Sequence, residues 1–327
     1  MALDEFSIRM KEARHMMGFS MQKLVDLAGG VVTKQSVSRY EQGIMQPKKK
    51  AREALAEVMG VSVSYFQGDN LRIDLPLLRT TTGGKMTDEE FTVLEARITF
   101  WAERYFNKER KALGQVPAFV NPLKGFKVRT IDDAIRAADR LRQSWRCGDG
   151  TLPGLLRLME RKGLRILSTE LPEGVLGAAT RDEHEHPFIV LDMRRKRTNT
   201  ERLRFTAAHE LAHLLLTFPD DSEFSQEKRC NLFASFFLFP KSTFLEEFGS
   251  VPREQLHLEE LIDLRELYGV SIASQVHEAW DLGLITRAHY DWWFNEMINP
   301  NILESNWGNY PYAETIGREK RLEVRGK

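Results

Sequence analysis

Two histidines four positions apart, with a glutamate directly after the first, stand in the segment RFTAAHELAHLLL at residues 204–216. On an α-helix, His209 and His213 would point to the same side. Two neutral imidazoles so placed supply two of the three protein ligands of a catalytic zinc ion. Glu210 would accept a proton from a water whose pKa the zinc ion lowers, so the motif predicts hydrolysis of peptide bonds.

The alternative interpretation is a buried helix that carries this pattern by chance. Two imidazoles and a carboxylate in a largely apolar helix are costly to bury without partners, which favours the metal site. Thr198 and Glu201 fit the pattern S/T-x-x-E, so we expect a capping box at the start of the helix.

A third ligand is expected from the next predicted helix, SQEKRCNLFASFFLFP, which begins near Ser225. Glu227 is the carboxylate in its first turn and completes a His–His–Glu set. Cys230, one turn further, would bind zinc as a thiolate, and Asn231 would orient Glu227 or bind substrate. Three further carboxylates in the connecting segment are also candidate ligands, namely Asp220, Asp221 and Glu223.

Two more histidines, His184 and His186, lie in RDEHEHPF, a polar turn predicted between two strands. Histidines in such a turn are usually solvated. The functional alternative is that one of them stabilises the oxyanion of a tetrahedral intermediate.

The predicted metal helix follows a short run of other elements. The sequence predicts helices over 131–145 and 152–162, and then three strands broken by glycine or proline. Further helices are expected after Pro240. They include YGVSIASQVHEAWDLGLI, a second helix-turn-helix shape that we interpret as a packing or partner-binding unit because it is not markedly basic.

The first 68 residues predict five short helices, of which the second and third form a helix-turn-helix. The second helix of such a motif enters the major groove by its N-terminal residues. A basic run that includes Lys50 and Arg52 opens the fourth helix and suits phosphates. The candidate DNA-binding residues are Gln22, Lys34, Gln35, Ser36, Ser38, Arg39, Lys48 and Lys49.

Charge supports a local nucleic-acid surface. The chain has 47 basic and 47 acidic residues, but residues 1–68 have ten basic against seven acidic. A protein-interaction domain with solvated lysines is the alternative. Two cysteines are too few for a disulfide framework. No apolar run resembles a signal peptide or spans a bilayer, so we expect a cytoplasmic protein without a membrane partner.

Between these regions, residues 69–86 resemble a linker with Gly83 and Gly84 as its most flexible point. A long helix is expected over 87–113, with Thr87 and Glu90 as a capping box. Its apolar stripe either packs on the next domain or forms a dimer seam. The stripe consists of Phe91, Leu94, Ile98, Trp101 and Tyr105.

Residues 6–67, with SRYEQG followed by a proline and the closing GVSVSYFQG, resemble the Xre family of lambda-repressor-like helix-turn-helix domains. The longer turn AGGVVTKQ departs from that pattern. Residues 131–298 resemble the ImmA/IrrE family of zinc peptidases. That resemblance implies His209, His213 and Glu227 as zinc ligands and Glu210 as base. Family members typically cleave a helix-turn-helix repressor, and an edge strand beside the helix would hold the substrate.

The second resemblance has two departures, Ala212 in place of the usual glycine and Cys230 in place of the usual alanine. Neither removes a reactive group. We expect a mainly α fold with a small sheet of about three strands, in the α+β class. We expect four divisions of the chain. They are a DNA-binding domain over 1–68, a linker with a long helix over 69–130, a peptidase domain over 131–298 and a tail over 299–327.

The expected function is a DNA-binding transcriptional regulator with a zinc-dependent endopeptidase that cleaves a repressor or partner protein. The two family resemblances imply a stress, prophage or toxin–antitoxin circuit as the setting. The expected cofactor is Zn²⁺, and the expected partners are double-stranded operator DNA, a protein substrate and a second copy of the chain. The alternative is a non-catalytic repressor or antitoxin that senses a signal or binds a partner. Glu210 favours the enzyme, because metal binding alone does not need it.

Overall fold

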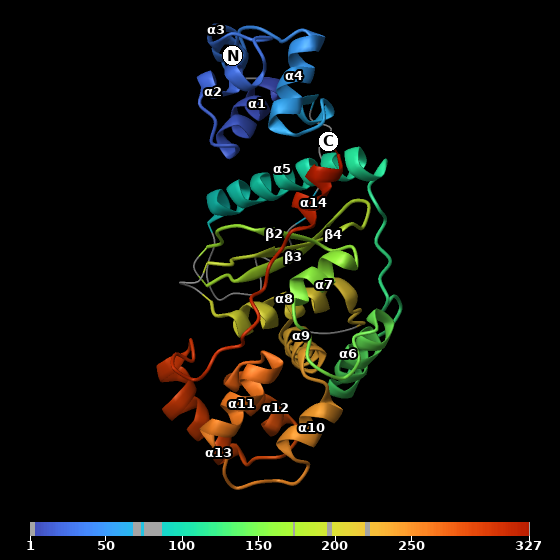
Figure 1. Cartoon of the computed structure of the whole chain (residues 1–327), viewed down its shortest axis with the longest axis vertical. Helices are drawn as coiled ribbons and strands as arrows, with labels where there is room; N and C mark the ends of the chain where they lie inside the picture. Colours follow the sequence, from blue (N-terminus) through green and yellow to red (C-terminus); the bar gives the residue numbers. More distant parts are fainter. Residues whose placement is uncertain are drawn as a thin grey trace.

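The computed structural model shows a mainly helical chain with one small sheet. The N-terminal helices lie at one end, α5 and the sheet lie in the middle, and a second group of helices forms the other end (Figure 1). The described residues are 4–67, 73–74, 87–172, 174–194, 198–219 and 223–326.

The N-terminal domain has the five predicted helices, and the fifth is a 3₁₀ turn. Ser20 and Thr33 cap α2 and α3, and α3 begins at Lys34 despite the longer turn. Pro47 precedes the cap residue of α4 and does not lie in its first turn. The elements are α1 (Glu5–Met16), α2 (Met21–Leu27), α3 (Lys34–Glu41), α4 (Lys49–Met59) and η1 (Ser64–Gln67).

The long helix α5 (Asp88–Leu113) begins with the predicted capping box between Thr87 and Glu90. Its apolar stripe is buried against the sheet. The prediction that the stripe packs on the next domain is therefore confirmed, and the stripe is not a free dimer seam. On the same helix, Phe100 contacts Tyr65 of the N-terminal domain, and Asn107 Nδ2 donates to the carbonyl oxygen of Gly60. Helix α5 therefore joins the N-terminal domain to the sheet.

The sheet has four strands in the order β1-β3-β4-β2. Strands β3 and β4 are antiparallel, whereas β2 and β4 are parallel. The three longer strands were predicted, but β1 was not, because it is a two-residue strand within the expected linker. Gly83 and Gly84 lie outside the described residues. The strands are β1 (Ile73–Asp74), β2 (Arg165–Ser168), β3 (Gly177–Asp182) and β4 (Pro187–Leu191).

The two faces of the sheet are covered by different helices. Successive strand residues point to opposite faces. Phe188 and Val190 of β4 accordingly belong to the core beneath α5, while Ile189 and Leu191 belong to the core shared with α8. The strands therefore form a layer between α5 and the helix that carries the two histidines.

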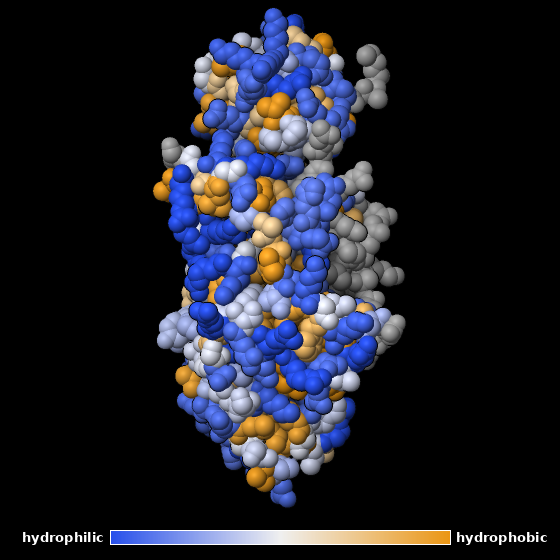
Figure 2. All heavy atoms as spheres, turned by 90° about the vertical axis from the view of Figure 1, so that its right-hand side faces the viewer, coloured by the Kyte–Doolittle hydropathy of each residue, from blue (hydrophilic) through white to orange (hydrophobic). Residues whose placement is uncertain are grey.

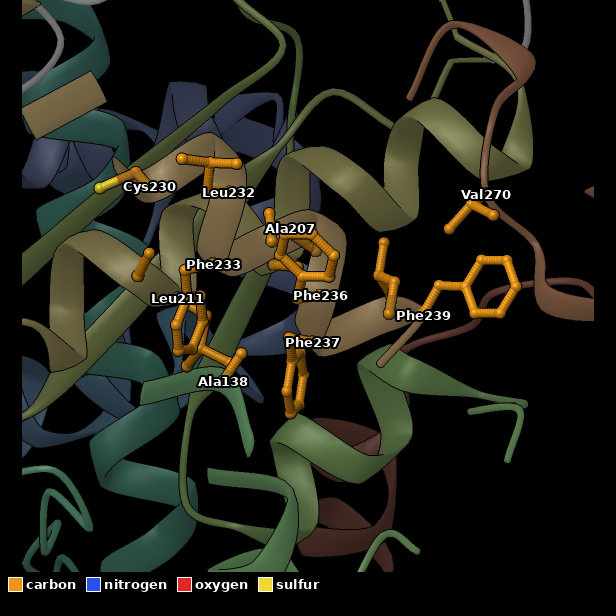
Figure 3. Close-up of a cluster of buried hydrophobic side chains, with 14 of the residues drawn as sticks. Ala138, Ala207, Leu211, Cys230, Leu232, Phe233, Phe236, Phe237, Phe239 and Val270 are labelled. Carbon is orange, nitrogen blue, oxygen red and sulfur yellow. The ribbon is translucent and has the colours of Figure 1, made fainter. Parts of the chain in front are cut away.

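That helix, α8 (Thr200–Leu215), packs against α9 (Glu223–Leu238), and α9 also packs on α6 (Ile131–Trp145). Figure 3 shows the buried side chains between them, with Phe233, Phe236 and Phe237 contributed by α9. Because α9 is buried on most of its surface, the register of α8 against α9 is fixed by large apolar side chains. Helix α7 (Leu155–Arg161) also contacts α8.

The predicted capping box at the start of α8 is wrong. Asn199 is the cap residue, and its side chain accepts from the backbone N–H of Arg202. Glu201 is instead 2% exposed and accepts from Arg265 Nε at 2.9 Å. The carboxylate of Glu201 is therefore bound by Arg265, 64 residues further along the chain, and does not complete the capping box.

The C-terminal helices complete the fold and include the predicted second helix-turn-helix shape, α11 and α12. Helix α12 contacts α9, which agrees with a packing role. The elements are α10 (Lys241–Phe248), α11 (Leu258–Tyr268), α12 (Ile272–Asp281), α13 (Arg287–Trp292), a π-helix (Trp293–Ile298), a 3₁₀ turn (Asn299–Asn301) and α14 (Arg318–Arg325).

Residues 299–326 run back along the molecule to α5 (Figure 1). Glu314 pairs with the buried Arg204 at 2.6 Å and accepts from the first backbone N–H groups of α7. Further on, Glu319 of α14 pairs with Lys108 of α5. The tail is therefore packed in place, which the sequence did not predict.

No helix among the described residues is long and apolar enough to cross a membrane. The face shown in Figure 2 is mostly hydrophilic, and its hydrophobic residues form small groups.

Candidate metal centre and DNA-binding surface

The packing of α8 on α9 brings three of the predicted site residues together. His209 Nε2 lies 3.0 Å from His213 Nε2, and each lies 3.2 Å from one carboxylate oxygen of Glu227. Among the described residues, this is the group of histidine, cysteine and acidic side chains whose geometry suits a metal ion. The two histidines come from one face of α8, and the carboxylate comes from the first turns of α9.

The spacing of these atoms fits zinc. Three ligand atoms about 2.0–2.1 Å from a tetrahedral zinc ion are roughly 3.3 Å from one another. The separations of 3.0–3.2 Å are close to that value, and the three nitrogen and oxygen donors suit the ion. Three protein ligands also leave a fourth position open, as catalytic zinc sites require.

The outward-facing nitrogen of each histidine has its own partner on α9. Asn231 Oδ1 lies 2.8 Å from His209 Nδ1, and Cys230 Sγ lies 3.7 Å from His213 Nδ1. With an ion bound at the two Nε2 atoms, these side chains would accept the protons that remain on Nδ1. Asn231 therefore contacts His209 and not Glu227, contrary to one of the two roles expected for it.

Cys230 is not a competing ligand in this arrangement. Burial raises the pKa of its thiol well above the ordinary value, and Glu227 and Glu210 raise it further. Its Sγ atom faces Nδ1 of His213 and not Nε2, so Cys230 lies outside the group of converging ligand atoms. Burial also raises the pKa of Glu227, but hydrogen bonds from the two histidines outweigh it and lower that pKa to about 2.

Glu210, the predicted base, is buried beside this cluster with 5% of its surface exposed. Burial raises its pKa, against the opposing effect of His209 and His213. Gly177, at the start of β3, lies directly on it. A Cβ atom there would be 2.6 Å from Thr206 Cγ2 and 3.2 Å from Glu210 Oε1. Sequence reasoning missed Gly177, because nothing local marks a strand glycine as a neighbour of α8.

The histidines of the hairpin are not brought into the cluster. His186 Nδ1 lies 2.7 Å from Asp182, and its ring contacts Phe106 of α5, on the face of the sheet away from α8. His184 is largely exposed. The oxyanion role stays a prediction, and these positions do not support it. Asp220 and Asp221 lie outside the described residues, as does the side chain of Glu223.

The candidate DNA-binding residues form a second site at the far end of the molecule, where α3 lies away from α5 (Figure 1). Lys34, Gln35 and Arg39 are exposed along α3. The cap positions of α4 add two further exposed cations, Lys48 and Lys49. These side chains present the donors and acceptors that base edges and phosphates need.

Four other residues of this surface have contacts within the protein. Ser36 donates to the carbonyl oxygen of Thr33 and completes the capping box of α3. Gln22 donates to Asp26, and Ser38 accepts from Gln42. Arg52 lies over the ring of Phe6 at 5.5 Å, and its expected phosphate contact stays a prediction.

Comparisons with known proteins agree with this division into two sites. Residues 10–66 match the helix-turn-helix family model, and residues 159–279 match the IrrE N-terminal-like domain model. The chain joins a helix-turn-helix domain to an IrrE N-terminal-like domain. The second match contains both histidines, Glu210 and Glu227, together with the strands β2, β3 and β4.

A relative from Bacillus subtilis (strain 168) resembles the helix-turn-helix domain. It is the SPbeta prophage-derived uncharacterized HTH-type transcriptional regulator YonR, which is 32% identical over 71 residues. The match covers 21% of this chain and 64% of the relative, so it spans less than two thirds of that protein. It supports the DNA-binding domain and does not extend to the IrrE N-terminal-like domain.

Proposed function

We propose that this chain is a transcriptional regulator whose IrrE N-terminal-like domain is a zinc-dependent endopeptidase that cleaves a regulatory protein. The observation that carries the proposal is the cluster of His209, His213 and Glu227, in which three ligand atoms converge. Asn231 and Cys230 orient the two imidazoles, as outer partners do at metal sites.

In this proposal, the three converging side chains hold the zinc ion. When bound, the ion supplies Lewis-acid chemistry, polarising a peptide carbonyl and lowering the pKa of water. Glu210 takes the proton from the attacking water and then gives it to the leaving amine. Its buried position beside the histidines keeps it within the site and away from bulk water.

We propose that the substrate backbone lies extended beside the sheet, near Gly177 at the start of β3. This end of β3 lies directly above α8, and Gly177 lies against Glu210. A peptide in this place would pass over the proposed base and could pair with a strand of the sheet.

The helix-turn-helix domain directs this activity to a regulatory setting. We propose that α3 reads operator DNA in the major groove and that Lys48 and Lys49 contact phosphates. The substrate is then a repressor or a partner protein in a stress, prophage or toxin–antitoxin circuit. A homodimer would read two half-sites, as helix-turn-helix dimers do.

The alternative is a non-catalytic sensor that binds metal or a partner through the same domain. Glu210 favours catalysis, because a buried carboxylate beside two histidines costs stability and contributes no ligand. Its position suits proton transfer better than it suits metal retention.

Metal analysis and one substitution test the proposal. The full chain should bind about one zinc ion, and Glu210→Gln should retain that ion while losing cleavage by about 10²–10⁴-fold. The exposed Glu296→Gln is the control and should cleave normally. New N-termini, measured by proteomics in cells that express each chain, would identify the substrate. A chain that takes up no zinc, or equal cleavage by wild type and Glu210→Gln, would contradict the mechanism.

A further inference from the structure

A cavity of about 650 Å³ lies next to the candidate metal centre. One wall is a single face of α9, formed by Glu227, Asn231 and Ser235. Helix α12 forms the opposite wall and contributes Glu278 and Trp280. Because Glu227 belongs both to the wall and to the metal cluster, a side chain held here would lie beside the reacting bond.

Glu278 is the unusual group in this cavity. It is 1% exposed, and neither of its carboxylate oxygens makes a hydrogen bond of normal geometry, although the Ser235 hydroxyl lies close enough to affect its pKa. Burial raises the pKa of Glu278 to about 8; Ser235 opposes the rise and Asp281 adds to it. A carboxyl group buried without a partner is costly. Its position in a cavity wall indicates that the missing partner comes from a ligand.

The other acidic groups of the cavity already have partners. Glu227 contacts the two histidines. Asp281 pairs with Lys228, whose side chain is 45% exposed. Glu304 accepts from the backbone N–H groups of Ile272 and Ala273 and pairs with Arg265. Glu278 is therefore the carboxyl of this cavity that is available to a ligand.

We propose that the cavity binds an arginine or lysine side chain of the substrate next to the bond that is cut, with Glu278 as its ion-pair partner. The inference rests on the proposed peptidase function and adds its substrate class. A guanidinium or ammonium group supplies the donors that both carboxylate oxygens lack. Phe205 and Trp280 also line the cavity and would pack against the aliphatic stem.

Binding of a cation favours the ionised carboxylate, so Glu278 loses its proton to solvent as the ion pair forms. Arg202, a partly exposed cation that also lines the cavity, does not share the buried position of Glu278. The ligand charge is therefore expected at the α12 wall. An uncharged side chain of the same shape should gain much less binding affinity from the same position.

A binding experiment tests this without turnover. The probes are N-acetyl-arginine methylamide and its neutral isostere N-acetyl-citrulline methylamide, titrated calorimetrically into the full chain carrying Glu210→Gln. The arginine probe should bind at least about tenfold more tightly than the citrulline probe. Adding Glu278→Gln should remove that preference, whereas Glu278→Asp should retain part of it.

Asp281→Asn is the matched control, because it removes a paired carboxylate from the same cavity and should keep the preference. Equal affinity for the two probes, binding of neither, or an unchanged preference in Glu278→Gln would overturn the inference. The outcome is separate from the proposed function, which fails if wild-type chain cuts no protein. A cleaving chain should also prefer peptides with arginine or lysine at one position, and Glu278→Gln should lose that preference.

Discussion

The two helices that carry the candidate sites differ in how far their polar side chains are exposed to solvent. Helix α3 presents Lys34, Gln35 and Arg39 to solvent, whereas α8 buries Glu210 and holds both histidines against partners on α9. A DNA-binding surface needs free donors, because its partners arrive with the DNA. A catalytic site needs side chains held in fixed positions, because small displacements of these side chains reduce the reaction rate.

The same difference extends to the cores around the two helices. The N-terminal domain has a small apolar core that includes a buried ion pair between Arg14 and Glu41. The region from α5 onward buries several such pairs, and they connect segments far apart in the chain. Substitutions at polar residues should therefore mainly change binding in the first region and both stability and activity in the second.

The largest expected effect is on the packed tail. Glu314→Ala leaves Arg204 buried without its carboxylate, and it removes the acceptor for the first N–H groups of α7. The free energy of unfolding should fall by about 3–5 kcal/mol. Urea unfolding followed by tryptophan fluorescence measures it, because all six tryptophans lie outside residues 1–68.

Asp291→Ala is the control for that measurement, since it breaks an exposed pair with Arg287 and should change stability by less than about 0.5 kcal/mol. Equal losses in the two variants would mean that the buried network is no more important than surface pairs. The proposed difference between the two regions would then have no energetic basis.

A second prediction concerns Gly177, where the fixed site should be sensitive to one added methyl group. Gly177→Ala would place Cβ against Thr206 and Glu210 and displace the base, while the zinc ligands stay in place. Cleavage should fall by about 10²-fold with zinc content unchanged. Gly150→Ala is the matched control, because its Cβ would meet nothing within 4 Å. Normal cleavage by Gly177→Ala would show that Glu210 tolerates displacement.

The sequence predicted elements and residue types better than it predicted partners. Helix α6 occupies the predicted 131–145, and α5 begins at the predicted capping box, because both depend on neighbouring residues. Glu201 was assigned to a local cap and instead contacts Arg265, whose proximity depends on the whole fold. Similarly, HELAH and Glu227 indicated the ligands, but the partners of the outer nitrogens follow from the packing of α8 on α9.

The third prediction separates those two outer partners. Asn231→Ala removes an oxygen acceptor from His209, whereas Cys230→Ala removes only a weak sulfur acceptor from His213. Zinc affinity, measured by competition with a chelator, should fall by about 10–100-fold in Asn231→Ala and by less in Cys230→Ala. The reverse order would show that Cys230 contributes more to the site than its long contact with His213 suggests.

The smallest effect is expected for substitutions on and near the exposed helix α3, and it should change DNA binding without changing stability. Arg39→Ala should weaken operator binding by about tenfold and relax preference at one base pair, because a bidentate contact is lost. Lys49→Ala should instead weaken binding to all sequences and reduce the salt dependence by about one counterion. Neither residue is buried, so thermal unfolding should not change. Footprinting at several salt concentrations distinguishes the two variants, and a footprint unaffected by Arg39→Ala would exclude α3 as the reading helix.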